Sequence, residues 1–222
     1  YSFIGVNSIA QLRSNNGQAD WLGQVPVGVP TQGDVLEVAH ATLKTLKTPK
    51  VAGLPNLTSG LVGTVGWDVI RHWEPTLRGK APNETDQPEL VLALATDIAV
   101  VDHVSGSVWL IANAVNVDDK PTRADWAFDN AVERLDAMQR QAATPTPGEA
   151  RINVLDPHVP QPELRFRTEK SHYEQAVEET KKHIVDGDVF QTVISQRLDI
   201  DSPADPFDVY RVLRTLNPSP YM

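Results

Sequence analysis

One proline-rich stretch, TPTPGEARINVLDPHVPQPE at residues 144–163, limits what this chain can fold into. It contains five prolines and one glycine. Because proline fixes φ and removes a backbone donor, neither a long helix nor a central strand can run through it. We interpret this stretch as a linker or extended arm, which separates a first region, residues 1–143, from a second region, residues 164–222.

The first region contains segments with the apolar content of a sheet. YSFIGV (1–6) suits a buried strand, and SGLVGTVGWDVIRHW (59–73) begins as a glycine-rich strand before turning into a short helix. The apolar run ELVLALATDIAVVDH (89–103) is predicted to pair with VWLIANAVNV (108–117) in a β-hairpin whose turn contains Gly106.

Two further segments of this region have helical spacing. TQGDVLEVAHATLKTLK (31–47) is predicted to form a helix capped by Thr31 or Asp34. ADWAFDNAVERLDAMQRQAA (124–143) is predicted to form an amphipathic helix. Its apolar positions are Trp126, Phe128, Ala131, Leu135 and Met138. Residues 17–33 hold several glycines and prolines and are predicted to form a loop.

The second region has the same mixed character. We expect a short strand at LRFR (164–167), a longer strand at DVFQTVISQRLDID (188–201), and a final helix at DPFDVYRVLRTLN (205–217). The segment EKSHYEQAVEETKKHIVDG (169–187) is predicted to form a helix that Gly187 closes, with Glu178 and Lys182 as an ion pair. The fold class is therefore α/β of the α+β type, with long antiparallel strands.

Composition argues against two classes of partner. The formal net charge is −9 and the basic residues are scattered, whereas nucleic-acid binding needs a basic patch. We expect no signal peptide, and no apolar run in these residues approaches the roughly 18 to 20 residues that cross a bilayer. The absence of cysteine fits a reducing cytoplasm. Since the chain starts without methionine in an apparent strand and stops abruptly at Met222, we expect a piece of a longer protein.

A search for reactive or metal-binding motifs finds little. GLVGTVG lacks the lysine of a phosphate-binding loop, so we interpret its glycines as points where another backbone or a helix packs closely. No histidine has a neighbour suited to a shared metal, so no metal site is predicted within this chain. The histidines are His40, His72, His103, His158, His172 and His183.

Two stretches have polar or unusual chemistry that could serve a ligand. Gln191, Ser195, Gln196 and Arg197 lie on the predicted strand after Gly187 and could line a site for an anionic ligand; the alternative, which the pattern favours, is an exposed strand face.

The other stretch is NPSPYM (217–222), in which two prolines stiffen the backbone and leave its carbonyls free to accept. Its tyrosine and methionine suit an amino-acid ligand, whose ammonium would lie on carbonyls and whose ring would lie against methionine. On the residues alone, a rigid loop that enters a core strand is the favoured interpretation.

Four stretches together resemble the anthranilate synthase component I family of chorismate-utilising enzymes. They are YSFIGV, GLVGTVGWDVIR, HYEQAVEETKKHIVDGDVFQTVISQRL and NPSPYM, in the family's order, and the resemblance spans essentially the whole chain. It implies antiparallel sheets packed between helices, with an N-terminal region that leads, from about Leu164, into the start of a chorismate-binding domain.

The resemblance also implies an activity. The family converts chorismate and ammonia into anthranilate and pyruvate in tryptophan biosynthesis, and a glutamine amidotransferase subunit usually supplies the ammonia. Mg²⁺ bridges glutamates and the substrate carboxylate. The family's catalytic residues, Mg²⁺ ligands and chorismate contacts lie beyond the end of this chain, so no catalytic or metal-binding residue is assigned here. We expect the fragment alone to be inactive.

Feedback inhibition by tryptophan is a further property that the resemblance implies. One wall of the family's tryptophan site corresponds to Pro220, Tyr221 and Met222. The other wall is a motif that precedes the YSFIGV strand, and it is not in this chain.

Alternatives stay open at this point. Aminodeoxychorismate synthase component I has the same fold and substrate but another product, whereas isochorismate and salicylate synthases match the N-terminal stretches less well. A non-catalytic module that binds an amino acid or the amidotransferase is the alternative from another class.

Overall fold

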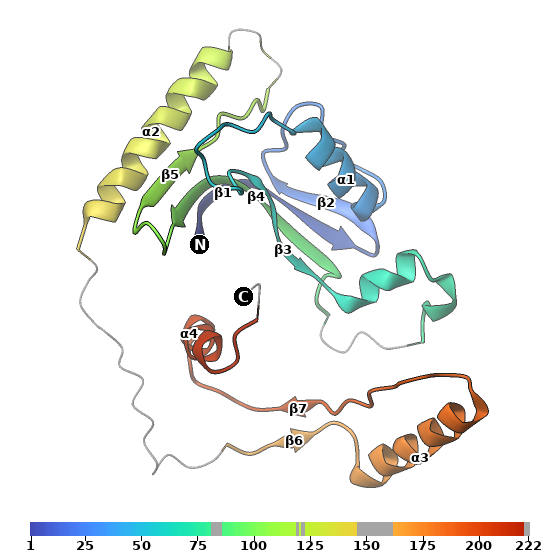
Figure 1. Cartoon of the computed structure of the whole chain (residues 1–222). Helices are drawn as coiled ribbons and strands as arrows, with labels where there is room; N and C mark the ends of the chain where they lie inside the picture. Colours follow the sequence, from blue (N-terminus) through green and yellow to red (C-terminus); the bar gives the residue numbers. More distant parts are fainter. Residues whose placement is uncertain (81–85, 119, 121–122, 146–161, 220–222) are drawn as a thin grey trace. The chain divides into compact units, whose positions relative to one another are not determined.

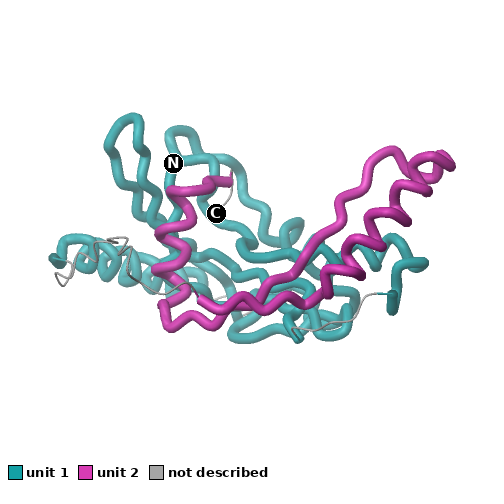
Figure 2. The backbone as a smooth tube through the Cα atoms, turned by 90° about the horizontal axis from the view of Figure 1, so that it is seen from below, with its two compact units in different colours: residues 1–147 teal, residues 148–222 magenta. Residues whose placement is uncertain are grey.

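The chain divides into two compact units, residues 1–147 and residues 148–222, which Figure 2 colours separately. The computed structural model describes residues 1–80, 86–118, 120, 123–145 and 162–219. The boundary between the units falls within the predicted linker, most of which lies outside the described residues. Each unit is therefore considered by itself.

Unit 1 is built on an antiparallel five-stranded sheet (Figure 1). Its strands are β1 (Ser2–Asn15), β2 (Gln18–Gly23), β3 (Gly60–Val65), β4 (Leu90–Val101) and β5 (Val108–Ala112). The order is β2-β1-β4-β3, and β5 pairs with the second half of β4. The predicted strands at residues 59–73 and 89–103 and the hairpin turn at Gly106, where φ is 70°, are confirmed.

Two helices cover parts of this sheet. The helix α1 (Val35–Thr45) packs against β1, β2 and β3, and α2 (Arg123–Ala143) packs against β5. A core forms under α1 from Leu12, Val35, Val38, Ala39 and Leu90. Two short 3₁₀ helices, η1 (Trp67–His72) and η2 (Pro75–Leu77), follow β3, so the predicted change from strand to helix after the glycine-rich segment is confirmed.

The burial predicted for YSFIGV is wrong, although the segment is a strand. Tyr1, Phe3 and Ile4 are all exposed within unit 1. The physical reason is the pairing: β2 pairs with β1 only from Ala10 onward, so the first half of β1 is an edge strand bonded to β4 alone.

The loop predicted over residues 17–33 contains a strand, β2. The sequence signal for β2 is the dipeptide Asn16-Gly17, which immediately precedes the strand. Both residues have positive φ, 51° and 79°, as the two central residues of a tight hairpin turn require. The other glycines and prolines of residues 17–33 favour a loop, and the prediction followed them instead of this turn signal.

The apolar face predicted for α2 is confirmed only in part. Ala127, Ala131 and Met138 are buried, whereas Trp126 and Phe128 are exposed. The buried positions follow one another at intervals of four and seven, which keeps them on one stripe of a helix. Trp126 instead lies beside the Arg123 guanidinium, 4.4 Å from the ring centroid.

Unit 2 contains β6 (Arg165–Phe166), α3 (Lys170–Asp186), β7 (Leu198–Asp199) and α4 (Pro206–Leu216). Both predicted helices are confirmed, and Gly187 closes α3 in the left-handed conformation with φ 84°. The predicted ion pair differs in register, because Glu178 pairs with Lys181 and Lys182 pairs with Glu179.

The long strand predicted at residues 188–201 is wrong except for β7. Its two residues pair with the two residues of β6, and no other strand of the described residues lies against this segment. A strand needs a partner for its backbone donors and acceptors, so the alternating pattern alone does not produce one. No described residue of unit 2 is buried.

Glycine spacing in β3 serves close backbone packing. A Cβ atom added at Gly63 would lie 1.9 Å from the carbonyl oxygen of Val91 on β4, and one added at Gly66 would lie 3.1 Å from the carbonyl oxygen of Glu89. This confirms the packing interpretation of GLVGTVG.

Candidate functional site

The residues predicted to form a tryptophan-binding wall, Pro220, Tyr221 and Met222, lie outside the described residues. The described part of their surroundings is α4. Its cap Asp205 accepts a hydrogen bond from the Phe207 N–H at 2.8 Å, and the helix ends at Leu216, shortly before Pro218. The tryptophan site therefore stays a prediction.

The polar residues considered for an anionic ligand do not form one face. Gln196 Nε2 donates to the Thr168 carbonyl at 2.9 Å, and Arg197 Nε donates to Asp199 Oδ1, also at 2.9 Å. Gln191 and Ser195 are exposed on a segment that is not a strand. Because the alternation of a strand is absent, its predicted polar face is absent too, and the anion-site hypothesis loses its basis.

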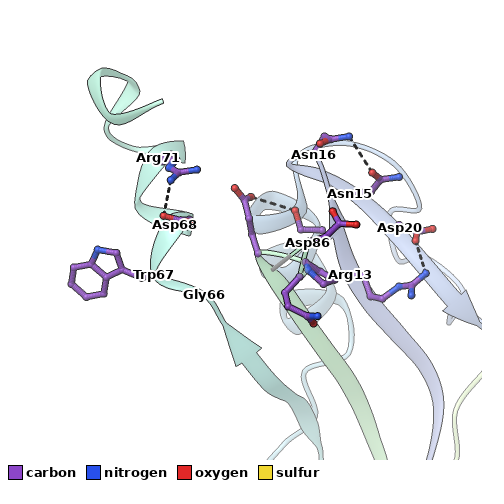
Figure 3. A pocket seen from close by; sticks show the side chains of 13 residues that line it. Arg13, Asn15, Asn16, Asp20, Gly66, Trp67, Asp68, Arg71 and Asp86 are labelled. Atoms are coloured by element: carbon purple, nitrogen blue, oxygen red, sulfur yellow. Dashed lines mark hydrogen bonds and ion pairs between the residues drawn. The ribbon is translucent and has the colours of Figure 1, made fainter. Parts of the chain in front are cut away.

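A polar pocket of about 610 Å³ lies in unit 1 (Figure 3). It opens between the tip of the β1–β2 hairpin, η1, and the residues that lead into β4. Its charged and aromatic lining includes Arg13, Asp20, Trp67, Asp68, Arg71 and Glu89. Trp67 is 87% exposed, so its ring is open to solvent at the rim.

Both guanidinium groups of this pocket are paired with carboxylates. Arg13 pairs with Asp20 at 2.9 Å, and Arg71 pairs with Asp68 at the same distance. Because each guanidinium already has a carboxylate partner, the lining offers polar contacts without a net attraction for an anion. The pocket suits a small polar molecule better than a phosphate or carboxylate.

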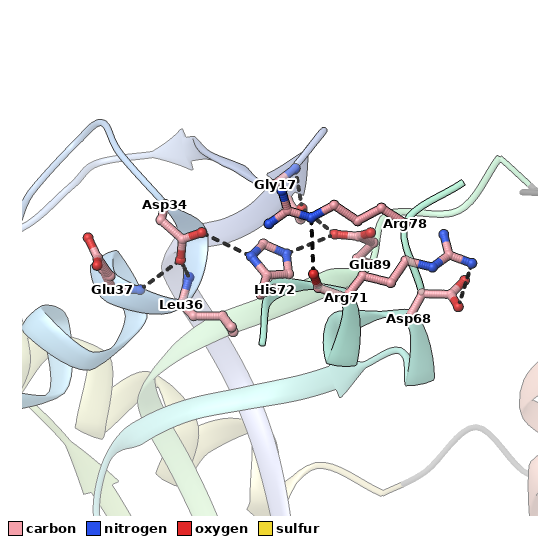
Figure 4. A network of polar contacts seen from close by, with 10 residues as sticks. Gly17, Asp34, Leu36, Glu37, Asp68, Arg71, His72, Arg78 and Glu89 are labelled. Atoms are coloured by element: carbon pink, nitrogen blue, oxygen red, sulfur yellow. Dashed lines mark hydrogen bonds and ion pairs between the residues drawn. The ribbon is translucent and has the colours of Figure 1, made fainter. Parts of the chain in front are cut away.

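A histidine network lies beside the pocket and shares Glu89 with it (Figure 4). His72, the last residue of η1, is mostly buried and faces one carboxylate with each ring nitrogen. Nδ1 is 2.9 Å from Asp34 Oδ2, and Nε2 is 3.2 Å from Glu89 Oε2. Asp34 is also the cap of α1, where its Oδ1 accepts from the N–H groups of Leu36 and Glu37.

The charges in this network shift the pKa values of its members in opposite directions. Burial disfavours the charged imidazole of His72, but its hydrogen bonds and charge interactions with Glu89 and Asp34 outweigh burial, so the pKa of His72 is raised. Burial likewise opposes ionisation of Asp34. The hydrogen bonds from Glu37, His72 and Leu36 prevail, so the pKa of Asp34 is lowered.

Sequence reasoning missed this network. It searched for partners of each histidine within a few positions, whereas Asp34 is 38 residues from His72 and Glu89 is 17 residues from it. The one available signal was Asp34, which the sequence correctly proposed as a helix cap. Only the packing of η1 against α1 and β4 brings the three side chains together.

The described residues form neither a metal-binding cluster nor a membrane-spanning helix. No three His, Asp or Glu side chains among them are placed to hold a metal ion, so they do not fit a Mg²⁺ site. In the same part of the chain, every helix is too short or too polar to cross a membrane.

Comparison with known proteins gives one family. The family model described as chorismate binding enzyme matches residues 1–222. The chain is 45% identical to anthranilate synthase component 1 of Arthrobacter globiformis and 44% identical to that of Mycolicibacterium smegmatis. All of the chain is matched in both cases, over 42% and 41% of the relative's length.

A solved structure has a similar fold. The crystal structure of anthranilate synthase component I from Streptococcus pneumoniae matches with a TM-score of 0.76 and 24% identity. The match covers 100% of this chain and 46% of the other. The mixed α/β class predicted from the sequence, with antiparallel sheets and helices, is confirmed. The chain thus spans less than half the length of the relatives it matches.

Proposed function

The chain belongs to the family of chorismate binding enzymes, and on that premise we propose that it is the N-terminal part of an anthranilate synthase component 1. The observation that carries this proposal is sequence identity of 44–45% along the whole chain with relatives of that name. A shared fold alone would leave the product of the enzyme open.

The reaction that we propose for the longer protein is a carbon–oxygen lyase reaction. Ammonia adds to the chorismate ring as the ring hydroxyl leaves as water, and elimination of pyruvate then leaves the aromatic amine anthranilate. A glutamine amidotransferase subunit would supply the ammonia. The name component 1 supports a second component, and the cysteine-free composition fits our proposal of a cytoplasmic enzyme.

This chain would contribute structure to that enzyme, and we assign it no catalytic residue. The two guanidinium groups of its polar pocket are each paired with a carboxylate, and His72 is held between two carboxylates. Because the described residues do not fit a Mg²⁺ site, we place the ligands of the metal in the part of the protein outside this chain.

Feedback inhibition by tryptophan is the second part of the proposal. We assign one wall of the inhibitor site to Pro220, Tyr221 and Met222, because the NPSPYM stretch matches the family motif at these positions. The stiff backbone offers carbonyls to an ammonium group, and the methionine offers an apolar contact to an indole ring.

Product identification tests the proposed activity. The longer polypeptide that contains this chain is incubated with chorismate, Mg²⁺ and ammonium, and the products are separated beside authentic anthranilate and aminodeoxychorismate. We expect anthranilate and an equal amount of pyruvate, with both suppressed by tryptophan. Aminodeoxychorismate without pyruvate would overturn the assignment in favour of the other synthase.

A further inference from the structure

We propose that His72 is a proton-operated clamp: the protonated ring ties η1 to the cap of α1 and to the start of β4, and loss of its proton releases η1. The clamp is a conformational device of unit 1, independent of the proposed activity. It links three segments that are distant in sequence, and it forms the support of one wall of the polar pocket.

The geometry identifies the charged form of the ring. Both acceptors are carboxylate oxygens, which have no proton to give when ionised. A neutral imidazole has one N–H, so its second nitrogen would turn a lone pair toward a carboxylate. Only the imidazolium satisfies both contacts at once. Charge-assisted hydrogen bonds of this kind are roughly twice as strong as neutral ones.

Each partner of His72 is itself fixed to a different element. Asp34 is held by two backbone N–H groups at the start of α1. The backbone carbonyl of Glu89 accepts from the Gly66 N–H at 2.7 Å, and its side chain accepts from Ser14 at 3.5 Å. The carboxylates of Asp34 and Glu89 are thus held at two different elements. Because the imidazolium bonds to both, it holds η1 in one position relative to α1 and β4.

The hairpin turn completes the surroundings of the ring. A Cβ atom at Gly17 would lie 3.2 Å from Cε1 of His72, so the turn backbone packs closely on the imidazole edge. The Gly17 carbonyl also accepts from the Val35 N–H at 3.0 Å, which joins the same turn to α1. The ring therefore lies where the β1–β2 turn, η1, α1 and β4 meet.

Other charged groups near the clamp have their own partners. Arg71, next to His72 on η1, pairs with Asp68, and Arg78 after η2 donates to the Arg71 carbonyl at 3.2 Å. Figure 4 shows the Glu37 carboxylate on the far side of Asp34 from the imidazole. Asp34 and Glu89 are thus the acidic groups that face the ring from the elements packed against it.

The sign of the pH dependence follows from the two opposite shifts. Because the pKa of His72 is raised by folding, its stabilisation is complete below the ordinary value of 6.5 and is lost as pH rises through the higher folded value. Because the pKa of Asp34 is lowered, its stabilisation is complete above 3.8 and is lost as pH falls through the lower folded value. The clamp is therefore closed in mildly acid solution and opens as pH rises through the folded pKa of His72, which lies above 6.5.

Hydrogen exchange of the 222-residue chain tests the release of η1. Peptides covering residues 66–78 are compared between the wild type and His72→Gln at pH 6 and at pH 9, each pair at the same pH. We expect faster exchange in the variant at pH 6, with the ratio of the two rates falling toward one at pH 9. The matched control is His103→Gln, since His103 is exposed and bonded to the Ser2 hydroxyl. For this control, the peptides should exchange at the wild-type rate at both pH values.

A titration of the wild type keeps the proposal testable if His72→Gln fails to fold. The ring resonances of His72, followed by NMR, should titrate with a midpoint above 6.5, and Glu89→Gln should move that midpoint down. The proposal is overturned by a midpoint at or below 6.5, or by rates for residues 66–78 whose ratio does not change between the two pH values.

Discussion

At the scale of single residues, Gly63 is the point where β3 approaches β4 too closely for a side chain. A Cβ atom there would lie 1.9 Å from the Val91 carbonyl oxygen, so alanine must move one of the two strands. We expect Gly63→Ala to lower the free energy of unfolding by about 1–3 kcal/mol, the usual range for overpacking, because the clash is with backbone rather than with a side chain that could turn away.

The matched control for this change is Gly5→Ala in β1, where an added Cβ meets nothing within 4 Å. Its effect should stay within about 0.5 kcal/mol, as at other open positions. Urea unfolding followed by circular dichroism measures both. Equal stabilities of the two variants would show that the strands can separate at Gly63 without cost.

Met222 gives a second prediction at this scale, for the proposed tryptophan site. In the longer polypeptide, Met222→Ala should raise the tryptophan concentration for half-inhibition roughly tenfold, which corresponds to loss of about 1.4 kcal/mol of binding. The exposed Leu216 of α4 provides the control, Leu216→Ala, which should leave inhibition unchanged. Unaltered inhibition in Met222→Ala would remove this residue from the site.

At the scale of elements, α2 is fixed to the sheet by a buried charge. Asp97 on β4 is 0% exposed, and it accepts hydrogen bonds from Arg134 of α2 and, at 3.2 Å, from Asn7 of β1. Arg134 also donates to the Asn113 carbonyl at 2.8 Å and to Asn130 at 3.0 Å. The helix is therefore positioned by one guanidinium that reaches the sheet and the segment after β5.

Removing that guanidinium leaves a buried carboxylate without its counter-charge. We expect Arg134→Met to destabilise the chain by about 3–5 kcal/mol, the range for breaking a buried ion pair from one side. Arg140→Met, at an exposed position of the same helix, serves as the control and should change stability by less than about 0.5 kcal/mol. Thermal or urea unfolding measures the stability of both variants. A small effect of Arg134→Met would mean that water reaches Asp97.

The elements also show what sequence reasoning can and cannot reach. Helix caps and ends were predictable from local chemistry, as Asp34 and Gly187 illustrate. The strand β2 was missed because the residues that follow its turn signal, Asn16-Gly17, include several glycines and prolines, which are typical of a loop. The strand expected at residues 188–201 failed for another reason, since strand formation depends on a partner that no local pattern specifies.

The same limit explains the histidine network. Asp34 caps α1, His72 ends η1 and Glu89 directly precedes β4, and their meeting is a consequence of how η1 packs after β3. No spacing rule connects them. By contrast, the proposed tryptophan wall is a continuous motif, so the sequence can suggest it even though Pro220, Tyr221 and Met222 lie outside the described residues.

At the scale of the whole molecule, the two units differ in how much they bury. Unit 1 has cores around Leu12 and around Ile98, whereas no described residue of unit 2 is buried. In native-state hydrogen exchange of this chain, we expect β4 to be among the most protected segments and α3 and α4 to exchange quickly, because local stability follows buried contacts. If the amides of α3 were as well protected as those of β4, another surface would have to cover α3 and shield it from solvent.

The measurement that tests the central claim most directly is the rate of anthranilate formation, followed by its fluorescence, with chorismate, Mg²⁺ and ammonium. The 222-residue chain and the longer polypeptide that contains it are assayed side by side at equal concentration. We predict a steady, tryptophan-sensitive increase for the longer polypeptide and no increase for the chain alone. Absence of anthranilate from the longer polypeptide would contradict the proposed function, and turnover by the chain alone would contradict the assignment of the chemistry to residues outside it.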